Sequence, residues 1–124
     1  MALRSRARAL LRGPEIQLRP TEIPTIAGPA RLDRKTKNLV KRLHPGDIAV
    51  IDHTDLDRIA AEDLAASGVL AVVNCSRSST DRYPNRGPLI LARAGVTLVD
   101  APAAPLFEEL SDGDELPHQI RVRY

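Results

Sequence analysis

The hydrophobic residues of the chain form three short continuous runs, separated by amphipathic and polar stretches. The runs fall within residues 47–52, 69–74 and 96–100. A continuous apolar run of this length, without alternation of polar residues, is typical of a strand that is buried on both faces. We therefore predict three strands of a parallel sheet.

Apolar residues recur at helical spacing between these predicted strands. The stripe of the first helix is formed by Leu56, Ile59, Ala60 and Leu64. That helix ends at Ser67-Gly68, and a second helix over residues 89–94 stops at Gly95. The order strand, helix, strand with connections of this length implies a right-handed parallel unit, which occurs twice.

Shorter elements are predicted on both sides of this repeat. Residues 33–43 show the pattern of an amphipathic helix with a cationic face, and residues 105–110 form one or two helical turns. Asp112-Gly113-Asp114 predicts a tight turn before an extended end over residues 115–124. Four prolines within residues 13–29 indicate a linker without a helix or a central strand.

These elements define the fold class and the domain organisation. The predicted class is α/β, with a small, mostly parallel sheet flanked by helices. Residues 1–30 are expected to be a basic, Pro-rich tail and linker that begins as a disordered arm. Residues 31–124 are expected to form a single domain, since 124 residues are too few for two independent cores.

Charge is distributed unevenly along the chain. Residues 1–46 hold 11 basic and 3 acidic residues, whereas residues 47–124 hold 7 basic and 13 acidic ones. A basic leader attracts anionic surfaces such as nucleic acid or lipid headgroups, although solvated tails of this composition are commoner. Aromatic residues, which would stack on bases, make up only 2% of the chain, so nucleic-acid binding is the least favoured interpretation.

Cys75 is the lone cysteine, so an internal disulfide is excluded. No apolar run approaches the roughly 18 residues that span a membrane, and we expect a cytoplasmic location. Cys75 lies where a strand meets a loop, and Arg77 and Arg82 nearby could lower the pKa of its thiol. The alternative is a small side chain that fills a packed corner. We assign no catalytic residue and no cofactor.

Polar segments follow each predicted strand, and ligands of parallel α/β sheets bind beyond the carboxyl ends of the strands. The segments expected along this edge are residues 52–57, 75–87 and 100–104. Asp52, His53, Asp55 and Asp57 could hold a ligand or a divalent metal ion there, or act as an acid and base. Capping of the following helix by Asp55 or Asp57 is the simpler explanation, so no metal is assigned.

The loop from Ser76 to Pro88 is rich in hydroxyl and guanidinium groups and leads into a helix. Such a junction can bind a phosphate or a carboxylate, but the loop lacks the glycine spacing and the lysine of a P-loop. An ordered loop that contacts a partner protein is the alternative. The candidate binding residues in the loop are Ser78, Arg82, Tyr83, Pro84, Asn85 and Gly87.

Two motifs are specific enough to suggest a family: the strand Gly46–His53, Gly-Asp-Ile-Ala-Val-Ile-Asp-His, and the loop Arg82–Pro88, Arg-Tyr-Pro-Asn-Arg-Gly-Pro. Shorter motifs lie within residues 28–31, 36–43, 55–58 and 71–74. Together they resemble the amino-terminal domain of SteA-like cytokinetic-ring proteins, over most of residues 28–114. Asp81 stands where this family pattern has Gly, so a positive φ there would strain the loop.

The resemblance implies a cytoplasmic protein of actinobacterial cell division and cell-wall control that acts at the division site. In that family the domain precedes one resembling thiamin pyrophosphokinase and a membrane-anchoring end, which this chain lacks. Kinase-like chemistry would belong to that later domain and to no residue here. Residues 117–124 differ from the usual continuation, so we expect a truncated or altered form.

A weaker similarity links the chain to the swivelling phosphohistidine domains of phosphoenolpyruvate-using enzymes. The shared order is a Gly-Asp-Ile strand, a hydroxyl-rich loop, a helix ending in Ala-Arg-x-Gly-Val and a late Asp-Gly-Asp turn. The carrier histidine of those domains would fall within residues 85–87, where this chain has none. The similarity therefore supports a swivelling-domain-like fold and not phosphoryl transfer.

Two functions follow as expectations. The first is a non-catalytic interaction or regulatory domain that presents the Ser76–Pro88 loop to division-site proteins. The alternative is a domain that binds a nucleotide or phosphorylated small ligand together with the kinase-like domain. In that case Arg82 and Arg86 would bind anions, and Asp52 or Asp55 would hold a metal. Self-association into a homo-oligomer is left open by the sequence.

Overall fold

A computed structural model describes residues 26–82 and 85–116. The disordered arm predicted at the start of the chain and the extended end predicted beyond residue 116 lie outside these residues, as do Tyr83 and Pro84. The elements, in order, are β1 (Gly28–Leu32), α2 (Thr36–Leu39), η2 (Val40–Arg42), β2 (Ile48–Ile51), α3 (Arg58–Ala66), β3 (Ala71–Asn74), α4 (Gly87–Arg93), β4 (Thr97–Asp100), α5 (Leu106–Glu109) and β5 (Glu115–Leu116).

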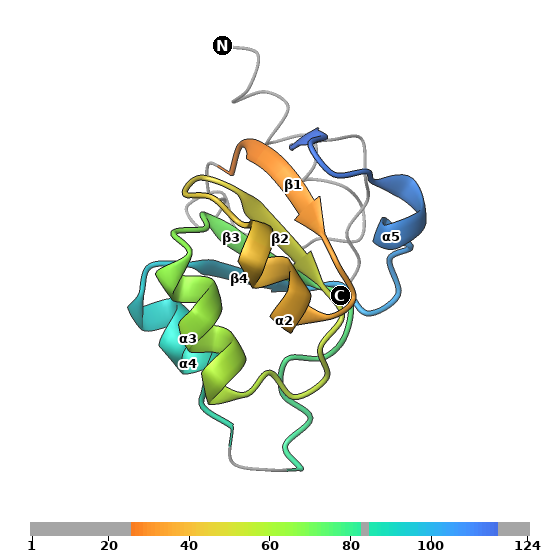
Figure 1. Cartoon of the computed structure of the whole chain (residues 1–124). Helices are drawn as coiled ribbons and strands as arrows, with labels where there is room; N and C mark the ends of the chain where they lie inside the picture. The colour runs from red at the N-terminus through yellow and green to blue at the C-terminus, as the bar shows by residue number, and fades with distance from the viewer. Residues whose placement is uncertain (1–25, 83–84, 117–124) are drawn as a thin grey trace.

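The sheet has five strands in the order β4-β3-β2-β1-β5. Strands β1 to β4 pair in parallel, and β5 is antiparallel to β1. The three strands predicted from the apolar runs and their parallel pairing are thus confirmed, as is a mostly parallel α/β sheet. In Figure 1, α2, α3 and α4 cover one face of the sheet, and α5 lies on the other side.

The two faces of the sheet have separate cores because successive strand residues point in opposite directions. Towards α2, α3 and α4, the buried side chains include Leu39, Ile51, Leu64, Val72 and Leu91. On the opposite face, Ile48 and Val50 pack with Leu106, Leu110 and Leu116. The continuous apolar runs are explained by this burial of β2 and β3 on both sides.

The linker prediction is wrong at its end, because Gly28 and Pro29 belong to β1. Pro29 pairs with Glu115 of the two-residue strand β5, and β1 therefore lies inside the sheet, between β2 and β5. A proline near the start of a strand is tolerated because only one backbone donor is lost there. Beyond it, Ala30 donates its N–H to the carbonyl of Asp114 at 2.8 Å.

The helix predictions are confirmed, with one face corrected. Asp57 caps α3 by accepting the N–H of Ala60 at 2.8 Å. The predicted apolar stripe placed Ile59 in the core, but its side chain is 64% exposed and Ala61 is buried instead. Because α3 starts only at Arg58, Leu56 belongs to the preceding loop, and the buried face of the helix runs through Ala61 and Leu64.

The remaining short elements agree with the sequence pattern. The amphipathic helix is shorter than predicted and consists of α2 and η2. A helical turn, α5, lies within residues 105–110, and Gly113 has a φ of +91° in the predicted tight turn. Within the described part of the chain, no helix is both long enough and apolar enough to cross a membrane.

Candidate functional site

Asn74, at the end of β3, is the centre of the polar edge of the sheet. Its Nδ2 donates to the carbonyl of His53 and to the Ser78 hydroxyl, both at 2.9 Å. Its Oδ1 accepts the N–H groups of His53 and Ser76, both at 3.0 Å. Asn74 is fully buried. All four hydrogen bonds of the amide therefore join the segments after β2 and β3.

Ser78 links this centre to the end of β4. Its N–H donates to Asp100 Oδ2 at 2.9 Å, and its hydroxyl donates to Oδ1 of the same carboxylate. Asn85 then donates from Nδ2 to the Ser78 carbonyl at 2.7 Å. Ser78 is only 3% exposed. Ser78 and Asn85, both predicted as binding residues, thus hold the loop in place.

Asp55 fastens the outer part of the same loop. Its carboxylate accepts the Thr80 N–H at 2.7 Å and the Thr80 hydroxyl at 2.8 Å. The N–H groups of Asp55 and Leu56 donate to the carbonyls of Arg77 and Ser78, each at 2.9 Å. The segment after β2 and the loop after β3 therefore run side by side.

The two other predicted carboxylates also have protein partners. Asp52 accepts the hydroxyl of Ser76 and forms an ion pair with Arg34 at 3.0 Å. Asp57 caps α3 and lies 3.5 Å from Nε2 of His53. Over residues 26–82 and 85–116, no group of three His, Cys, Asp or Glu side chains is arranged to hold a metal ion.

The exposed residues of the loop, Arg77, Ser79, Asp81 and Arg82, form its tip and differ from its base. Asp81 has a φ of +64°, in the left-handed region that residues other than Gly, Asn and Asp rarely adopt. Arg77, Arg82 and Arg86 are exposed, and none of them forms an ion pair with another described residue. Gly87, where the loop enters α4, is buried against Leu56. The predicted residues thus divide into a fixed base and an exposed basic tip.

Cys75 does not have the activated thiol that neighbouring arginines could have produced. Burial and the negative charge of Asp52 raise the pKa of the thiol to about 11, which outweighs the opposing effect of Arg34. The side chain packs against the core on the α5 side of the sheet. The packed-corner interpretation of Cys75 is the one that the structure supports.

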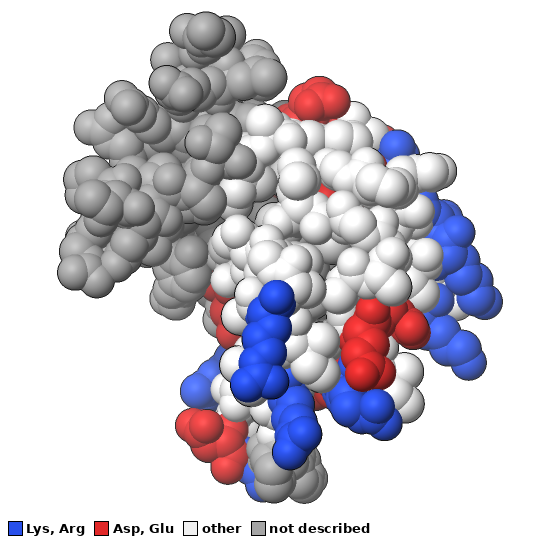
Figure 2. All heavy atoms as spheres, turned by 90° about the vertical axis from the view of Figure 1, so that its left-hand side faces the viewer, with Lys and Arg blue, Asp and Glu red and all other residues white. Residues whose placement is uncertain are grey.

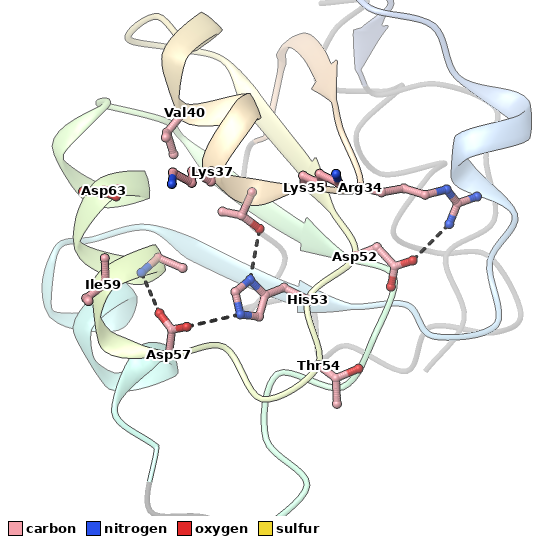
Figure 3. A pocket seen from close by; sticks show the side chains of 12 residues that line it. Arg34, Lys35, Lys37, Val40, Asp52, His53, Thr54, Asp57, Ile59 and Asp63 are labelled. Atoms are coloured by element: carbon pink, nitrogen blue, oxygen red, sulfur yellow. Dashed lines mark hydrogen bonds and ion pairs between the residues drawn. The ribbon is translucent and has the colours of Figure 1, made fainter.

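A pocket of about 690 Å³ lies between α2 and α3, beside the same edge of the sheet (Figure 3). Its lining includes Asp52, His53 and Asp57, which belong to the predicted cluster after the first strand, and Lys37 and Ile59, which were not predicted as site residues. The only sequence signal for it was the pair of lysines at the start of α2, and lysines are common on helices; the pattern had placed Ile59 in the core. No family model, curated protein or solved structure matches this chain.

Proposed function

We propose that the chain is the amino-terminal domain of a SteA-like cytokinetic-ring protein and acts there as a non-catalytic interaction module. The surface that it presents to division-site proteins is the exposed tip of the loop, Arg77, Ser79, Asp81 and Arg82, together with Arg86. The observation that carries this proposal is the contrast between a base fixed by buried hydrogen bonds and a tip whose arginines point to no described partner.

A fixed loop base suits recognition of a protein partner. Because Asn74, Ser78 and Asp55 already hold the backbone, little conformational entropy would be lost when the tip is bound. Arg77, Arg82 and Arg86 would favour a partner with an acidic surface, since opposite charges increase the rate of encounter. In Figure 2, Lys and Arg side chains, together with some acidic ones, lie on the lower part of this face, the end that carries the loop, and further Lys and Arg side chains lie along its right-hand edge.

The polar residues of the edge also fit an interaction role better than a catalytic one. The carboxylates of Asp52, Asp55 and Asp100 each accept bonds from neighbouring side chains. A general acid or base needs a group within reach of its substrate. These three groups instead stabilise the loop that carries the exposed arginines.

The finer fold assignment, to the swivelling-domain type, is part of this proposal. Its support is that the shared features occur in the proposed order, at β2, the 75–86 loop, α4 and the turn at Gly113. The α2, α3 and α4 layer on one face of the sheet, with α5 on the other, is compatible with this type.

Proximity labelling in an actinobacterial host that expresses the full tagged chain tests the proposed function. The variant is Arg82→Glu, which reverses a charge at the loop tip. Its control is Arg93→Glu, an exposed arginine in the last turn of α4. We expect the wild type and the control to label division-site proteins and the Arg82 variant to lose most of that labelling.

Two outcomes would contradict the proposal. The first is a wild-type chain that labels no division protein above the background of an untagged strain. The second is labelling by the Arg82 variant that equals labelling by the wild type and the Arg93 control, which would exclude the loop tip as the contact surface. Circular dichroism of the purified variants establishes that the fold is retained in each case.

A further inference from the structure

The pocket between α2 and α3 has a simple structural origin. α3 packs against α4, whereas α2 packs mainly against β2, so the two helices leave a space between them. Its volume of about 690 Å³ is within the range of small-molecule sites, which is roughly 300–1,000 Å³. It opens at the carboxyl end of β2, where ligands of parallel α/β sheets bind.

One wall of the pocket is aliphatic. Val40 contributes from η2, and Ile59 and Ala60 contribute from α3. The side chain of Ile59 is 64% exposed and lies at the pocket. An apolar ligand group placed here would remove this aliphatic surface from water.

A chain of polar side chains lies at the base of the pocket and fixes the orientation of His53. The imidazole Nδ1 lies 3.1 Å from the hydroxyl of Thr36, and Nε2 lies 3.5 Å from Asp57 Oδ2 (Figure 3). Thr36 is buried, and the exposed fraction of the His53 side chain is 26%. The polar end of the pocket is therefore held in one arrangement before any ligand is bound.

Some of the charged side chains around the pocket form ion pairs and others do not. Arg34 turns away from it, towards Asp52 and Glu108, and its guanidinium lies 4.5 Å from the centre of the Phe107 ring. Lys35 and Lys37, in contrast, form no ion pair with any described residue.

Three acidic residues line the pocket, and two of them already have partners. Asp52 is paired with Arg34, and Asp57 is bonded to the N–H of Ala60 and faces His53. Asp63, on α3, has no ion pair within the described residues. The lining as a whole is therefore formally neutral, with three basic and three acidic side chains, but its α2 side carries two ammonium groups that form no ion pair within the described residues.

We infer that this pocket binds a small organic anion, with its phosphate or carboxylate group on the α2 side, at Lys37, and an apolar body against Val40 and Ile59. The ammonium group would donate charge-assisted hydrogen bonds to the oxyanion. This site is separate from the loop tip, and it uses neither Arg82 nor Arg86. It is also independent of the proposed interaction with division-site proteins.

Titration of the ¹⁵N-labelled full chain with phenyl phosphate, followed by NMR, tests this inference. Phenyl phosphate combines an oxyanion with an apolar ring. We expect saturable shifts of the amide signals of Lys37, Val40, His53 and Ile59. In the variant Lys37→Gln, the affinity should fall at least about tenfold, as expected from the loss of charged hydrogen bonds.

The control variant is Lys41→Gln, because Lys41 is an exposed lysine of η2 that does not line the pocket. Its affinity for phenyl phosphate should match that of the wild type. Benzoate in parallel identifies the preferred oxyanion: tighter binding of phenyl phosphate indicates a phosphorylated ligand, and tighter binding of benzoate indicates a carboxylate.

Three results would overturn the inference. One is the absence of saturable shifts at about 20 mM phenyl phosphate, a concentration well above the dissociation constant expected for a ligand of this size. Another is equal binding of phenol, which lacks the oxyanion. The third is an equal loss of affinity in the Lys41 control, which would indicate unspecific attraction to a basic helix.

Discussion

Gly87 lies directly against the backbone of Leu56, and a Cβ added at Gly87 would lie 2.0 Å from the Leu56 carbonyl oxygen. The obstacle is backbone, which cannot rotate away as a side chain can. Gly87→Ala should therefore destabilise the fold by about 3 kcal/mol, near the upper end of the usual overpacking cost. Unfolding in urea measures this loss. Ser79→Ala, in an exposed part of the same loop, should change stability by less than about 0.5 kcal/mol.

Ser78→Ala should loosen the loop as well as lower the stability. The substitution removes the acceptor of an Asn74 Nδ2–H bond and a donor to Asp100, both in a buried network. Leaving such groups unsatisfied costs about 1–3 kcal/mol. We expect trypsin to cleave at Arg77 and Arg82 faster in this variant than in Ser79→Ala. Equal cleavage rates would contradict the role of Ser78 in fixing the loop.

The sequence was sufficient for the parallel sheet because β2 and β3 are buried on both faces and thus appear as uninterrupted apolar runs. It was not sufficient for β1. Pro29 suggests that no strand can form there, and only the position of the partner strand shows that the missing backbone donor is tolerated. Pro29 faces a strand of two residues, and that strand follows it by more than eighty positions in the chain.

The polar edge was predicted as a region, but the roles of its residues were not. The chain position of Asn74, at the end of an apolar run, gave no sign that its amide would join two segments. Hydrogen bonds of this kind depend on three-dimensional neighbours. For the same reason the predicted carboxylates could be placed at one edge, while their individual partners, such as Thr80 for Asp55, could not be identified.

Cys75 should react slowly with alkylating reagents. Burial, followed by the charge of Asp52, raises the pKa of its thiol to about 11, and the thiolate is the reactive form. At pH 8 the reaction with iodoacetamide should be about a hundredfold slower in the folded protein than in urea, where the thiol has its ordinary pKa. A folded-state rate equal to that in urea would show that the thiol is neither buried nor beside a negative charge.

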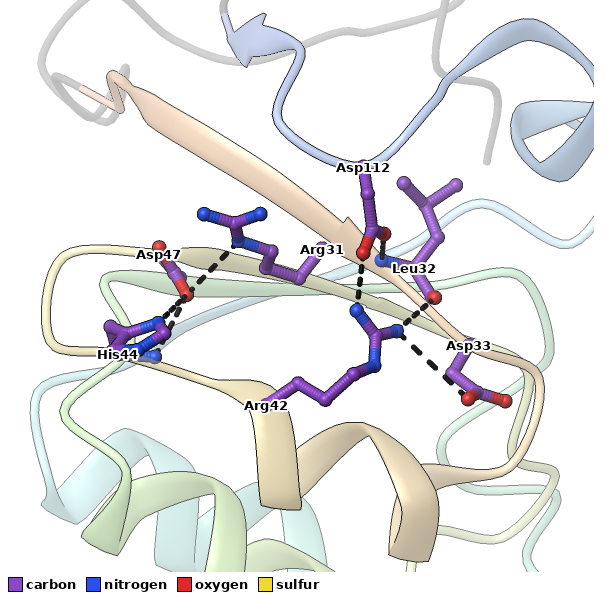
Figure 4. Close-up of polar contacts among 7 residues, drawn as sticks. All are labelled: Arg31, Leu32, Asp33, Arg42, His44, Asp47 and Asp112. Atoms are coloured by element: carbon purple, nitrogen blue, oxygen red, sulfur yellow. Dashed lines mark hydrogen bonds and ion pairs between the residues drawn. The ribbon is translucent and has the colours of Figure 1, made fainter.

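The carboxyl of Asp112 should make the stability of the fold depend on pH in the acidic range. Its burial raises the pKa, but bonds from the Leu32 N–H and the Arg42 guanidinium lower it more, so the pKa lies below its ordinary value (Figure 4). A lowered pKa in the folded state stabilises the protein above about pH 4, and this contribution is lost as the pH falls through the folded-state pKa.

Asp112→Asn tests this pH dependence. The variant should unfold at a lower temperature than the wild type at pH 7, and the difference should shrink as the pH is lowered from about 4 to 2.5. Arg42→Leu should retain part of the effect, because the N–H of Leu32 still bonds to the carboxylate. A difference between Asp112→Asn and the wild type that stays constant over this range would contradict the assignment.

Asp47 and Arg31 form a second polar contact, at the opposite end of β2 from the polar edge (Figure 4). Asp47 is 2% exposed and accepts the N–H of His44 at 2.8 Å. The Nε of Arg31 lies 3.5 Å from the same carboxylate, and among the described residues this buried atom has no hydrogen bond. The carboxylate therefore satisfies a backbone donor and faces a cation that has lost part of its hydration.

Removal of the Asp47 side chain should be more damaging than removal of its charge alone. Asp47→Ala leaves the His44 N–H and the Arg31 guanidinium without their partner, and the expected loss is about 3 kcal/mol. Asp47→Asn keeps an acceptor for the N–H, so it should cost less. Urea unfolding of Asp47→Asn, Arg31→Met and the double variant isolates the charge contact: we expect a coupling energy of at least about 0.5 kcal/mol. Strictly additive effects would mean that the 3.5 Å contact contributes nothing and that Asp47 acts only through His44.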